Sequence, residues 1–375
     1  MTPRTVAAFT DTYLPTVNGV TYTLESWREC WRDRGGRMDV VFPGAPGHEP
    51  GDGEYTTRSV GFPFYDGFRL GLPGVPDAVR DADVVHAHTP FALGLSGWYL
   101  ARRIDAPLVA SYHTPTAEYA DYLANGAAAT VVEGAARRYE RRYMNAADAV
   151  VVPSEPAGEH LRDIGVRSRI EVVPNGVDTE FFSRPGEDAL AAFREEYDLP
   201  ECGTGALVGY TGRHGFEKDL PEIPPAVAAA DADATLVFGG DGPARDALED
   251  ACEEAGVDAR FLGFLPREDL PAFYASLDAF CFPSPVETQG LVALEANACG
   301  TPVVGVDDGA LADTVREGET GYRYPRGDTA AFADAIDRTL AEREALSEGC
   351  LARREATSVE HAVDRLAEVY DAVDD

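Results

Sequence analysis

Lysine is almost absent from this chain: Lys218 is the only one among 375 residues, beside 31 arginines. Positive charge of any kind is scarce, because 65 acidic residues outnumber 32 basic ones and give a formal net charge of −33 at pH 7. Nucleic acids bind clustered cations, so we expect no nucleic-acid partner. An acid excess together with the loss of lysine is typical of adaptation to molar salt, which shortens the Debye length to about 3 Å. We therefore predict a halophilic protein.

Long apolar runs and paired cysteines are also missing. No run of about 18 apolar residues occurs, so we expect no transmembrane span, and the first residues lack the charged and apolar segments of a signal peptide. The six cysteines show no CxxC spacing and are Cys30, Cys202, Cys252, Cys281, Cys299 and Cys350. We expect buried, reduced thiols and a cytoplasmic protein.

The sequence does contain short apolar runs that alternate with longer helical patterns, in two series. With 45% hydrophobic residues, the chain can fill two cores and is too long for one. The strand-like runs are VAAF, MDVVF, DVVHAH, PLVASYH, DAVVVP and IEVVP, then ALVGYTG, ATLVFGG, ARFLGF, AFCFP and PVVGV. The helical patterns cover residues 18–35, 93–103, 127–145, 155–164, 222–230, 244–255, 291–298, 329–343 and 358–373.

This rhythm predicts an α/β fold with parallel, doubly wound sheets, since strand–helix–strand units cross over right-handed. We expect two Rossmann-like domains that face each other across a cleft. The predicted domains are residues 1–180, which bind the acceptor, and residues 181–355, which bind the donor. Residues 356–375 are expected to form a C-terminal helix that packs back on the first domain. Ligands should bind beyond the carboxyl ends of the strands.

The stretch PSPVETQGLVALEANACGTPVVG contains two glutamates in a distinctive setting. Glu287 precedes a turn with Gln289 and Gly290 that opens a helix, and we expect Glu295 about two turns inside that helix. The backbone N–H groups of Gly290 and Leu291 then form an anion site suited to a diphosphate. Glu287 can accept hydrogen bonds from sugar hydroxyls, and Glu295 from ribose hydroxyls. In a chain this acidic, the glutamate spacing alone also fits two ordinary surface residues.

With its flanking residues, this stretch resembles the GT-B glycosyltransferases of family 4, a retaining group that uses nucleotide sugars. FTDTYLPTVNGV (residues 9–20) is similar to the opening of the family's acceptor domain, and VPNGVD (173–178) to its end. GRHGFEKD (212–219) and FGGDGP (238–243) resemble donor-domain loops. The resemblance covers most of the chain. It implies transfer of a hexose with retention, by same-face attack in which the departing phosphate helps to deprotonate the acceptor hydroxyl.

Arg213 and Lys218 follow a predicted strand in the donor domain. Two cations there can stabilise the negative charge of a diphosphate leaving group, and the resemblance assigns them that role. Arg213 also fits an ordinary surface ion pair, and a Schiff-base role for Lys218 is a less favoured alternative. The resemblance places the glycine-rich turn with Gly240 and Asp241 beside the nucleotide, which makes these two residues weaker candidates.

The first predicted domain offers a second set of candidates. Asn18, Gly19 and Val20 precede a predicted helix, where glycine lets backbone amides approach a donor phosphate; a plain helix start has the same pattern. His113 ends a predicted strand, and the resemblance places it at the reaction centre, near the donor sugar. A capping or packed histidine is the alternative.

His86 and His88 alternate along another predicted strand, so we expect only one of them to face the cleft, and core packing is at least as favoured. A third metal ligand at suitable spacing is not evident. The acidic triplets at residues 81–83 and 231–233 are expected by chance among 65 acidic residues. We therefore predict catalysis without a metal and without any other cofactor.

Three features favour a membrane lipid as the acceptor and a peripheral contact with the membrane. TDTYLPTVNGV, SVGFPFYDGFRLGLP and HTPTAEYADYL are most similar to the subgroup that glycosylates diacylglycerol-type lipids. An aromatic loop would suit a lipid surface if exposed, and it contains Phe62, Phe64, Tyr65 and Phe68. Four arginines share one side of a predicted helix and are Arg137, Arg138, Arg141 and Arg142. They can bind anionic headgroups or, alternatively, satisfy the helix dipole.

Other functions stay open at this point. The acceptor can be a soluble or polyprenyl-linked glycan instead of a lipid. The fold is also compatible with a nucleotide-sugar epimerase or with a protein that binds sugar nucleotides without turnover. A UDP-hexose is the favoured donor, and UDP-glucose, UDP-galactose, UDP-sulfoquinovose and GDP-mannose all fit the motifs.

Overall fold

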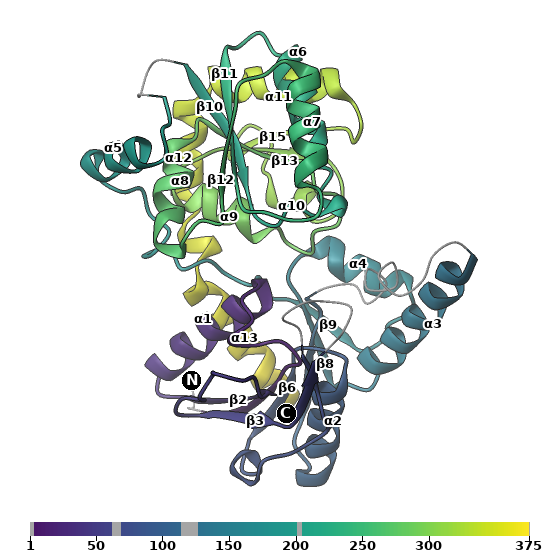
Figure 1. The fold of residues 1–375 in the computed structure, drawn as a ribbon. Coiled ribbons are helices and arrows are strands. Elements are labelled where there is room, and N and C mark those ends of the chain that lie inside the picture. The colour runs from purple at the N-terminus through teal and green to yellow at the C-terminus, as the bar shows by residue number, and fades with distance from the viewer. Residues whose placement is uncertain (1–3, 62–68, 114–126, 201–204, 375) are drawn as a thin grey trace. The chain divides into compact units, whose positions relative to one another are not determined.

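The computed structural model describes residues 4–61, 69–113, 127–200 and 205–374 (Figure 1). The chain divides into two compact units. The first unit comprises Met1–Gly176 together with Val359–Asp375, and the second comprises Val177–Ser358. The end of the chain therefore returns to the unit in which the chain begins.

The first unit contains a parallel sheet of seven strands in the order β3-β2-β1-β6-β7-β8-β9. Its strands are β1 (Thr5–Phe9), β2 (Arg37–Pro43), β3 (Glu54–Thr57), β6 (Val84–Ala87), β7 (Leu108–Ser111), β8 (Ala149–Val152) and β9 (Arg169–Val172). A separate antiparallel pair consists of β4 (Ser59–Gly61) and β5 (Arg69–Gly71). The helices are α1 (Gly19–Asp33), α2 (Ala92–Ile104), α3 (Ala127–Met144), α4 (Glu155–Asp163) and α13 (Val359–Asp374).

Strand β1 shows why this sheet is covered on both faces. Its residues alternate between two apolar cores, because successive side chains of a strand point to opposite faces. Val6 and Ala8 belong to the core that contains residues of α1 and α13. Ala7 and Phe9 belong to the core that contains residues of α2. A strand buried on both sides reads as a continuous apolar run, and this made TVAAF recognisable in the sequence.

Helix α13 lies beside α1, where yellow meets purple in Figure 1. Tyr370 of α13 meets Trp31 of α1 edge to face, with ring centroids 5.3 Å apart. Arg34 forms an ion pair with Asp364 at the rim of this contact. The C-terminal helix is therefore a structural part of the first unit.

The second unit contains a parallel sheet of six strands in the order β12-β11-β10-β13-β14-β15. Its strands are β10 (Ala206–Thr211), β11 (Ala234–Gly239), β12 (Ala259–Gly263), β13 (Ala279–Phe282), β14 (Val303–Val306) and β15 (Gly321–Tyr324). The helices are α5 (Glu187–Glu196), α6 (Ile223–Ala229), α7 (Arg245–Ala255), α8 (Leu270–Ser276), α9 (Leu291–Ala298), α10 (Leu311–Thr314), α11 (Thr329–Ala341) and α12 (Arg343–Ala352). The largest fully buried side chains of its core are aromatic, among them Tyr210, Tyr274, Tyr324, Phe238, Phe273, Phe280 and Phe282.

Some elements differ from the sequence-based expectation. The pattern over residues 329–343 is not one helix: α11 ends at Ala341, and α12 begins at Arg343. Strands β3 and β15 were not expected, because each has only four residues and carries polar side chains. Among the described helices, none combines the length and apolar character needed to cross a membrane. Cys252, Cys281, Cys299 and Cys350 are buried free thiols, Cys30 is half-buried, and Cys202 lies outside the described residues.

Candidate active site

Most of the predicted donor-binding residues lie in the second unit, at the carboxyl ends of neighbouring strands. Strand order reverses between β10 and β13, and open parallel sheets bind ligands at such a reversal. The segment after β10 carries Arg213 and Lys218, and the segment after β13 carries Glu287. The turn after β11 carries Gly240 and Asp241. Parallel strands thus bring together residues that are far apart in the sequence.

The structure pairs Lys218 directly with Glu287. The Lys218 ammonium donates a hydrogen bond from Nζ to Glu287 Oε1 at 2.5 Å. The two side chains are only 19% and 16% exposed, so solvent screens this ion pair less than it screens a surface pair. Each group therefore fixes the position of the other. A diphosphate that binds Lys218 would share the lysine with Glu287 or release the carboxylate.

Arg213 lies in the same segment and is more exposed, at 40% of its side chain. Its guanidinium forms an ion pair with Glu217, four residues later. Glu217 was not among the predicted site residues. The only sequence signal for its ion pair with Arg213 is their spacing of four residues. An arginine that reaches a ligand here would exchange this carboxylate for a phosphate, which also binds arginine with paired hydrogen bonds.

Glu295 is the fifth residue of α9, about one turn inside the helix rather than the two turns expected. The hydroxyl of Tyr274, from α8, donates to Glu295 Oε2 at 2.5 Å. Burial raises the pKa of Glu295 to about 6, and the hydrogen bond from Tyr274 opposes part of that rise. Sequence reasoning missed Tyr274, because no motif connects α8 with α9.

The N-terminus of α9 begins at a glycine that the fold requires. Gly290 precedes the helix with φ at 80°, and Leu291 is its first residue. A Cβ atom on Gly290 would lie 2.8 Å from Leu311 Cδ2. Gln289 is buried, and its carbonyl accepts a hydrogen bond from Thr314 Oγ1 at 2.6 Å. Because the first N–H groups of a helix have no partner within the helix, this end favours an anion.

The glycine-rich turn packs tightly against the segment after β10. Gly240 has φ at 96°, and a Cβ atom on it would lie 2.0 Å from the carbonyl oxygen of Gly212. Asp241 Oδ1 accepts from the N–H of Gly242 at 2.7 Å, within the same turn. His214, which the motif analysis did not single out, joins the two segments: its N–H donates to the Asp241 carbonyl at 2.9 Å.

In the first unit, the side chain of Asn18 caps the N-terminus of α1. It accepts a hydrogen bond from the N–H of Thr21 at 3.0 Å and donates to Thr12 Oγ1 at 2.7 Å. Gly19 is exposed and is the first residue of the helix, followed by Val20. The structure thus shows the helix-start geometry that the sequence offered as an alternative, and a phosphate contact by these amides stays a prediction.

The expectation that His86 and His88 point to opposite faces, so that only one faces the cleft, is wrong, whereas the alternative of core packing is confirmed for both side chains. Residues two apart along a strand share one face, and both side chains are buried with their rings stacked 4.1 Å apart. His113, at the end of β7, joins them: its Nε2 lies 3.1 Å from His88 Nδ1. The structure therefore gathers three histidines at the carboxyl ends of β6 and β7.

Comparisons with known proteins agree with this geometry. Residues 17–181 match the family described as Glycosyltransferase Family 4, and residues 196–350 match Glycosyl transferases group 1. The chain is similar to a GDP-mannose-dependent alpha-mannosyltransferase of Mycolicibacterium smegmatis, with 32% identity across 98% of this chain and 97% of the relative. The chain belongs to glycosyltransferase family 4.

Two further relatives of this family 4 enzyme act on other substrates. Sulfoquinovosyl transferase SQD2 of Arabidopsis thaliana is 30% identical, over 91% of this chain and 68% of the relative. Alpha-monoglucosyldiacylglycerol synthase of Streptococcus pneumoniae is 27% identical, over 85% of this chain and 75% of the relative. The protein is thus a glycosyltransferase, as the motifs indicated.

Solved structures share its fold. The sucrose-phosphate synthase of Thermosynechococcus elongatus matches with a TM-score of 0.76 at 22% identity, over 99% of both chains. Anabaena HepE in complex with UDP matches with a TM-score of 0.77 at 18% identity, over 98% of this chain and 100% of that one. The predicted architecture of two parallel α/β domains, the GT-B fold, is confirmed.

The residues predicted to contact a membrane are described only in part. Phe62, Phe64, Tyr65 and Phe68 lie outside the described residues. The four arginines of α3, Arg137, Arg138, Arg141 and Arg142, are all exposed. Among the described residues, no group of three or more His, Cys, Asp or Glu side chains is arranged to hold a metal ion.

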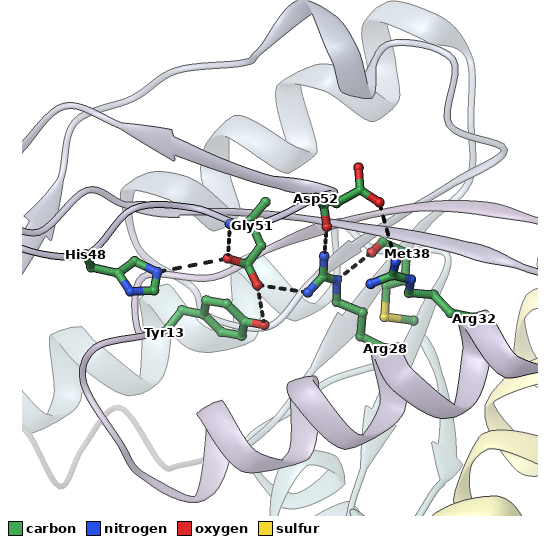
Figure 2. A network of polar contacts seen from close by, with 8 residues as sticks. Tyr13, Arg28, Arg32, Met38, His48, Gly51 and Asp52 are labelled. Carbon is green, nitrogen blue, oxygen red and sulfur yellow. Dashed lines mark hydrogen bonds and ion pairs between the residues drawn. The ribbon is translucent and has the colours of Figure 1, made fainter.

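The first unit also contains a polar network that includes none of these candidates (Figure 2). Arg28 of α1 forms an ion pair with Glu54 at 2.8 Å and donates to the carbonyl of Met38 at 3.1 Å. The hydroxyl of Tyr13 lies 3.5 Å from the same carboxylate. Beside this network is a cavity of about 220 Å³, lined by Arg28, Arg32, Arg37, Met38, Asp39, Asp52, Gly53, Tyr55 and Ala78. Its three arginines are ion-paired with carboxylates, so the network ties α1 to β2 and β3.

Proposed function

We propose that this enzyme is a retaining, metal-independent hexosyltransferase that transfers a hexose from a nucleotide sugar to a hydroxyl group of a glycerolipid. A UDP-hexose is the favoured donor. The observation that carries the proposal is the pairing of Lys218 with Glu287 in a chain that has no other lysine. This pair and the N-terminus of α9 lie at the carboxyl ends of the strands of one sheet, in a family 4 glycosyltransferase.

The second unit offers complementary groups for each part of such a donor. Arg213 and Lys218 supply positive charge to the diphosphate, aided by the amides of Gly290 and Leu291. Glu287 accepts hydrogen bonds from hydroxyls of the hexose, and Glu295 from hydroxyls of the ribose. A diphosphate that binds Lys218 weakens its hold on Glu287, which frees the carboxylate for the sugar. Binding of the two parts of the donor is thereby coupled.

The proposed reaction is a same-face substitution at the anomeric carbon. The bond from that carbon to the diphosphate oxygen breaks, and the bond to the acceptor oxygen forms. The departing phosphate takes the proton of the acceptor hydroxyl. Catalysis then rests on positioning and on stabilisation of the leaving charge by Arg213 and Lys218, with His113 near the sugar.

Three observations support a lipid acceptor and a peripheral membrane contact. The names of SQD2 and of the monoglucosyldiacylglycerol synthase point to sulfoquinovosyl transfer and to a diacylglycerol glycolipid. The four arginines of α3 stand exposed in a protein of net charge −33. Apolar side chains are exposed on α2, at Leu95 and Tyr99, and in β5 or directly after it, at Leu70 and Leu72. Exposed apolar groups and exposed cations in one unit suit an anionic lipid surface on the cytoplasmic side.

The test is a transfer assay in molar KCl, without added metal, using labelled UDP-glucose with and without a polar lipid extract. Label that partitions into organic solvent only when lipid is present supports the proposal. Binding of UDP-glucose without label in the organic phase would overturn the lipid acceptor. Failure to bind UDP-glucose would overturn the donor assignment.

A second candidate is mannosyl transfer from GDP-mannose. The relative from Mycolicibacterium smegmatis, similar over nearly its whole length, carries that activity in its name. The same assay with labelled GDP-mannose separates the two donors. Label that stays in the aqueous phase as an oligosaccharide would favour a soluble glycan acceptor.

A further inference from the structure

Three histidines form a closed cluster in the first unit, and only one of them is placed at the reaction centre by the proposed function. The ring of His88 stacks on His86 with centroids 4.1 Å apart, and on His113 with centroids 5.4 Å apart and planes 11° from parallel. The indole of Trp27 lies about equally far from all three, at 6.0 to 6.4 Å. His88 is therefore the middle ring of a buried stack.

His86 is anchored at both of its nitrogens. Nδ1 lies 2.6 Å from the hydroxyl of Tyr370, on α13, and Nε2 lies 2.8 Å from Ser111 Oγ, on β7. A hydroxyl can either donate or accept, so both contacts can be satisfied by a neutral imidazole. The orientation of the His86 ring is thus fixed, and His88 stacks on it.

His88 differs from His86 because only one of its nitrogens has a partner. Nδ1 lies 3.1 Å from His113 Nε2, whereas Nε2 is buried and has no hydrogen-bond partner among the described residues. A buried N–H group without an acceptor is rarer, and more costly, than a buried acceptor without a donor. The single proton of a neutral His88 therefore belongs on Nδ1. From there it is donated to His113 Nε2.

This donation dictates the state of His113. If Nε2 accepts a proton from His88, the neutral His113 ring carries its own hydrogen on Nδ1. Burial lowers the pKa of His113 to about 4, while a hydrogen bond with Asn175 opposes that shift. Burial also lowers the pKa of His88 well below its usual value. Both rings are therefore neutral near pH 7, so each carries a single N–H hydrogen.

We propose that His88 is a positioning residue that holds His113 in its Nδ1-protonated tautomer and fixes the orientation of its ring. Because Nε2 of His113 is then occupied by His88, the hydrogen bond between His113 and Asn175 falls on Nδ1, whose N–H donates to the Asn175 side chain. The relevance of this tautomer to turnover rests on the proposed role of His113 at the reaction centre. The tautomer itself does not depend on that role.

The first measurement uses the unmodified protein. Imidazole ¹⁵N and ¹³C chemical shifts report the tautomer of each of the seven histidines, and a His113→Asn variant assigns the signals of His113. We expect a hydrogen on Nδ1 of His113 near neutral pH. A hydrogen on Nε2 of His113, or a charged ring, would overturn the proposal.

A matched pair of variants tests the consequence for turnover. The amide nitrogen of Asn in His88→Asn can take the place of Nδ1 and still donate, whereas Gln in His88→Gln places its amide near the position of Nε2. We expect the Asn variant to keep the Nδ1 tautomer of His113 and most of kcat, and the Gln variant to lose about tenfold or more in kcat. Thermal unfolding of both variants confirms that they are folded.

Equal kcat values for two folded variants, or an unchanged His113 tautomer in His88→Gln, would contradict the positioning role. Failure of the role that the proposed function gives His113 at the reaction centre has a different result. In that case His113→Ala would keep normal turnover, while the chemical shifts of the native protein would still show whether His88 sets the tautomer.

Discussion

The two units share one strand order around their first strand and differ in the charge they place at its carboxyl end. In the first unit the sheet reverses between β1 and β6, and in the second between β10 and β13. The first unit fills this edge with neutral imidazoles that bind one another, and its buried Asp11 accepts from Thr89 and from the N–H of Leu93. The second unit fills it with ion-paired charges, of which Lys218 and Glu287 are the clearest. Topology provides the same position for a site in both units, and the charges at that position make the second unit the proposed diphosphate site.

Removal of a charge from the second unit should have the largest effect on activity. We expect Lys218→Ala and Glu287→Ala each to lower kcat/KM at least about a hundredfold, because each removes a group that stabilises the donor or the leaving group. Initial rates at subsaturating donor measure the effect. The two variants should also raise the Kd of the donor, since in the proposed site Lys218 binds the diphosphate and Glu287 binds hydroxyls of the hexose.

Arg260→Ala is the matched control for these variants. Arg260 pairs with Asp258 on the surface of the same unit, near the start of β12, and exposed pairs contribute little. Its kcat/KM should stay within about twofold of the native value. Near-normal rates in Lys218→Ala would remove the main support for a diphosphate site in the second unit.

Gly240→Ala tests the same edge without a change of charge. A Cβ atom there would lie 2.0 Å from the Gly212 carbonyl, so the glycine-rich turn must shift away from the segment that carries Arg213 and Lys218. We expect donor affinity, measured by calorimetry, to fall about tenfold, because a displacement of about 1 Å is costly in such sites. Gly256→Ala is the control: its φ is also positive, at 67°, but nothing lies within 4 Å of the added atom. Equal donor Kd values for the two variants would show that displacement of the glycine-rich turn does not affect donor binding.

The sequence predicted the fold well because the fold depends on patterns that are local. Buried parallel strands are continuous apolar runs, and the helix predicted for residues 291–298 is α9 (Leu291–Ala298). Strands β3 and β15 escaped because a short edge strand with polar residues has no such pattern.

The contacts within the site were harder to predict from the sequence, because they join residues that are far apart in the chain. Motif resemblance selected Lys218 and Glu287, but no spacing rule states that residues 69 positions apart form an ion pair. Tyr274, the partner of Glu295, belongs to an ordinary apolar helix. His88 illustrates a different failure: residues two apart in a strand share a face, and correct use of that rule would have placed His86 and His88 together.

The pH dependence of donor binding tests whether the charged groups of the second unit or the neutral histidines of the first unit control the affinity for the donor. Glu295 has a pKa raised to about 6, so it loses its negative charge as the pH falls through 6. His113 has a pKa lowered to about 4 and stays neutral over the same interval. We therefore expect the Kd for a nucleotide sugar to rise up to about tenfold between pH 7 and pH 5, through the second unit. In Glu295→Gln the profile should be flat, and a profile that persists in this variant would assign the titration to another group.

The smallest expected effect concerns membrane binding by the four exposed arginines of α3, in the first unit. Its four arginines on α3 are exposed on a helix surface, so they suit a long-range attraction rather than a bound diphosphate. Arg141→Gln should weaken binding to anionic vesicles about fivefold at 0.15 M KCl, where the Debye length is about 8 Å. At 1 M KCl, with a Debye length of about 3 Å, the difference should vanish.

Arg162→Gln on α4 is the control for this experiment, because Arg162 is exposed but already paired with Glu155 at 2.8 Å. Sedimentation with vesicles at both salt concentrations measures the effect, and circular dichroism shows that each variant is folded. If Arg141→Gln binds like the native protein at low salt, the arginines of α3 act only on their own helix dipole. Any membrane contact in molar salt must then come from apolar side chains such as Leu95 and Tyr99, since salt screens charge but does not weaken apolar burial.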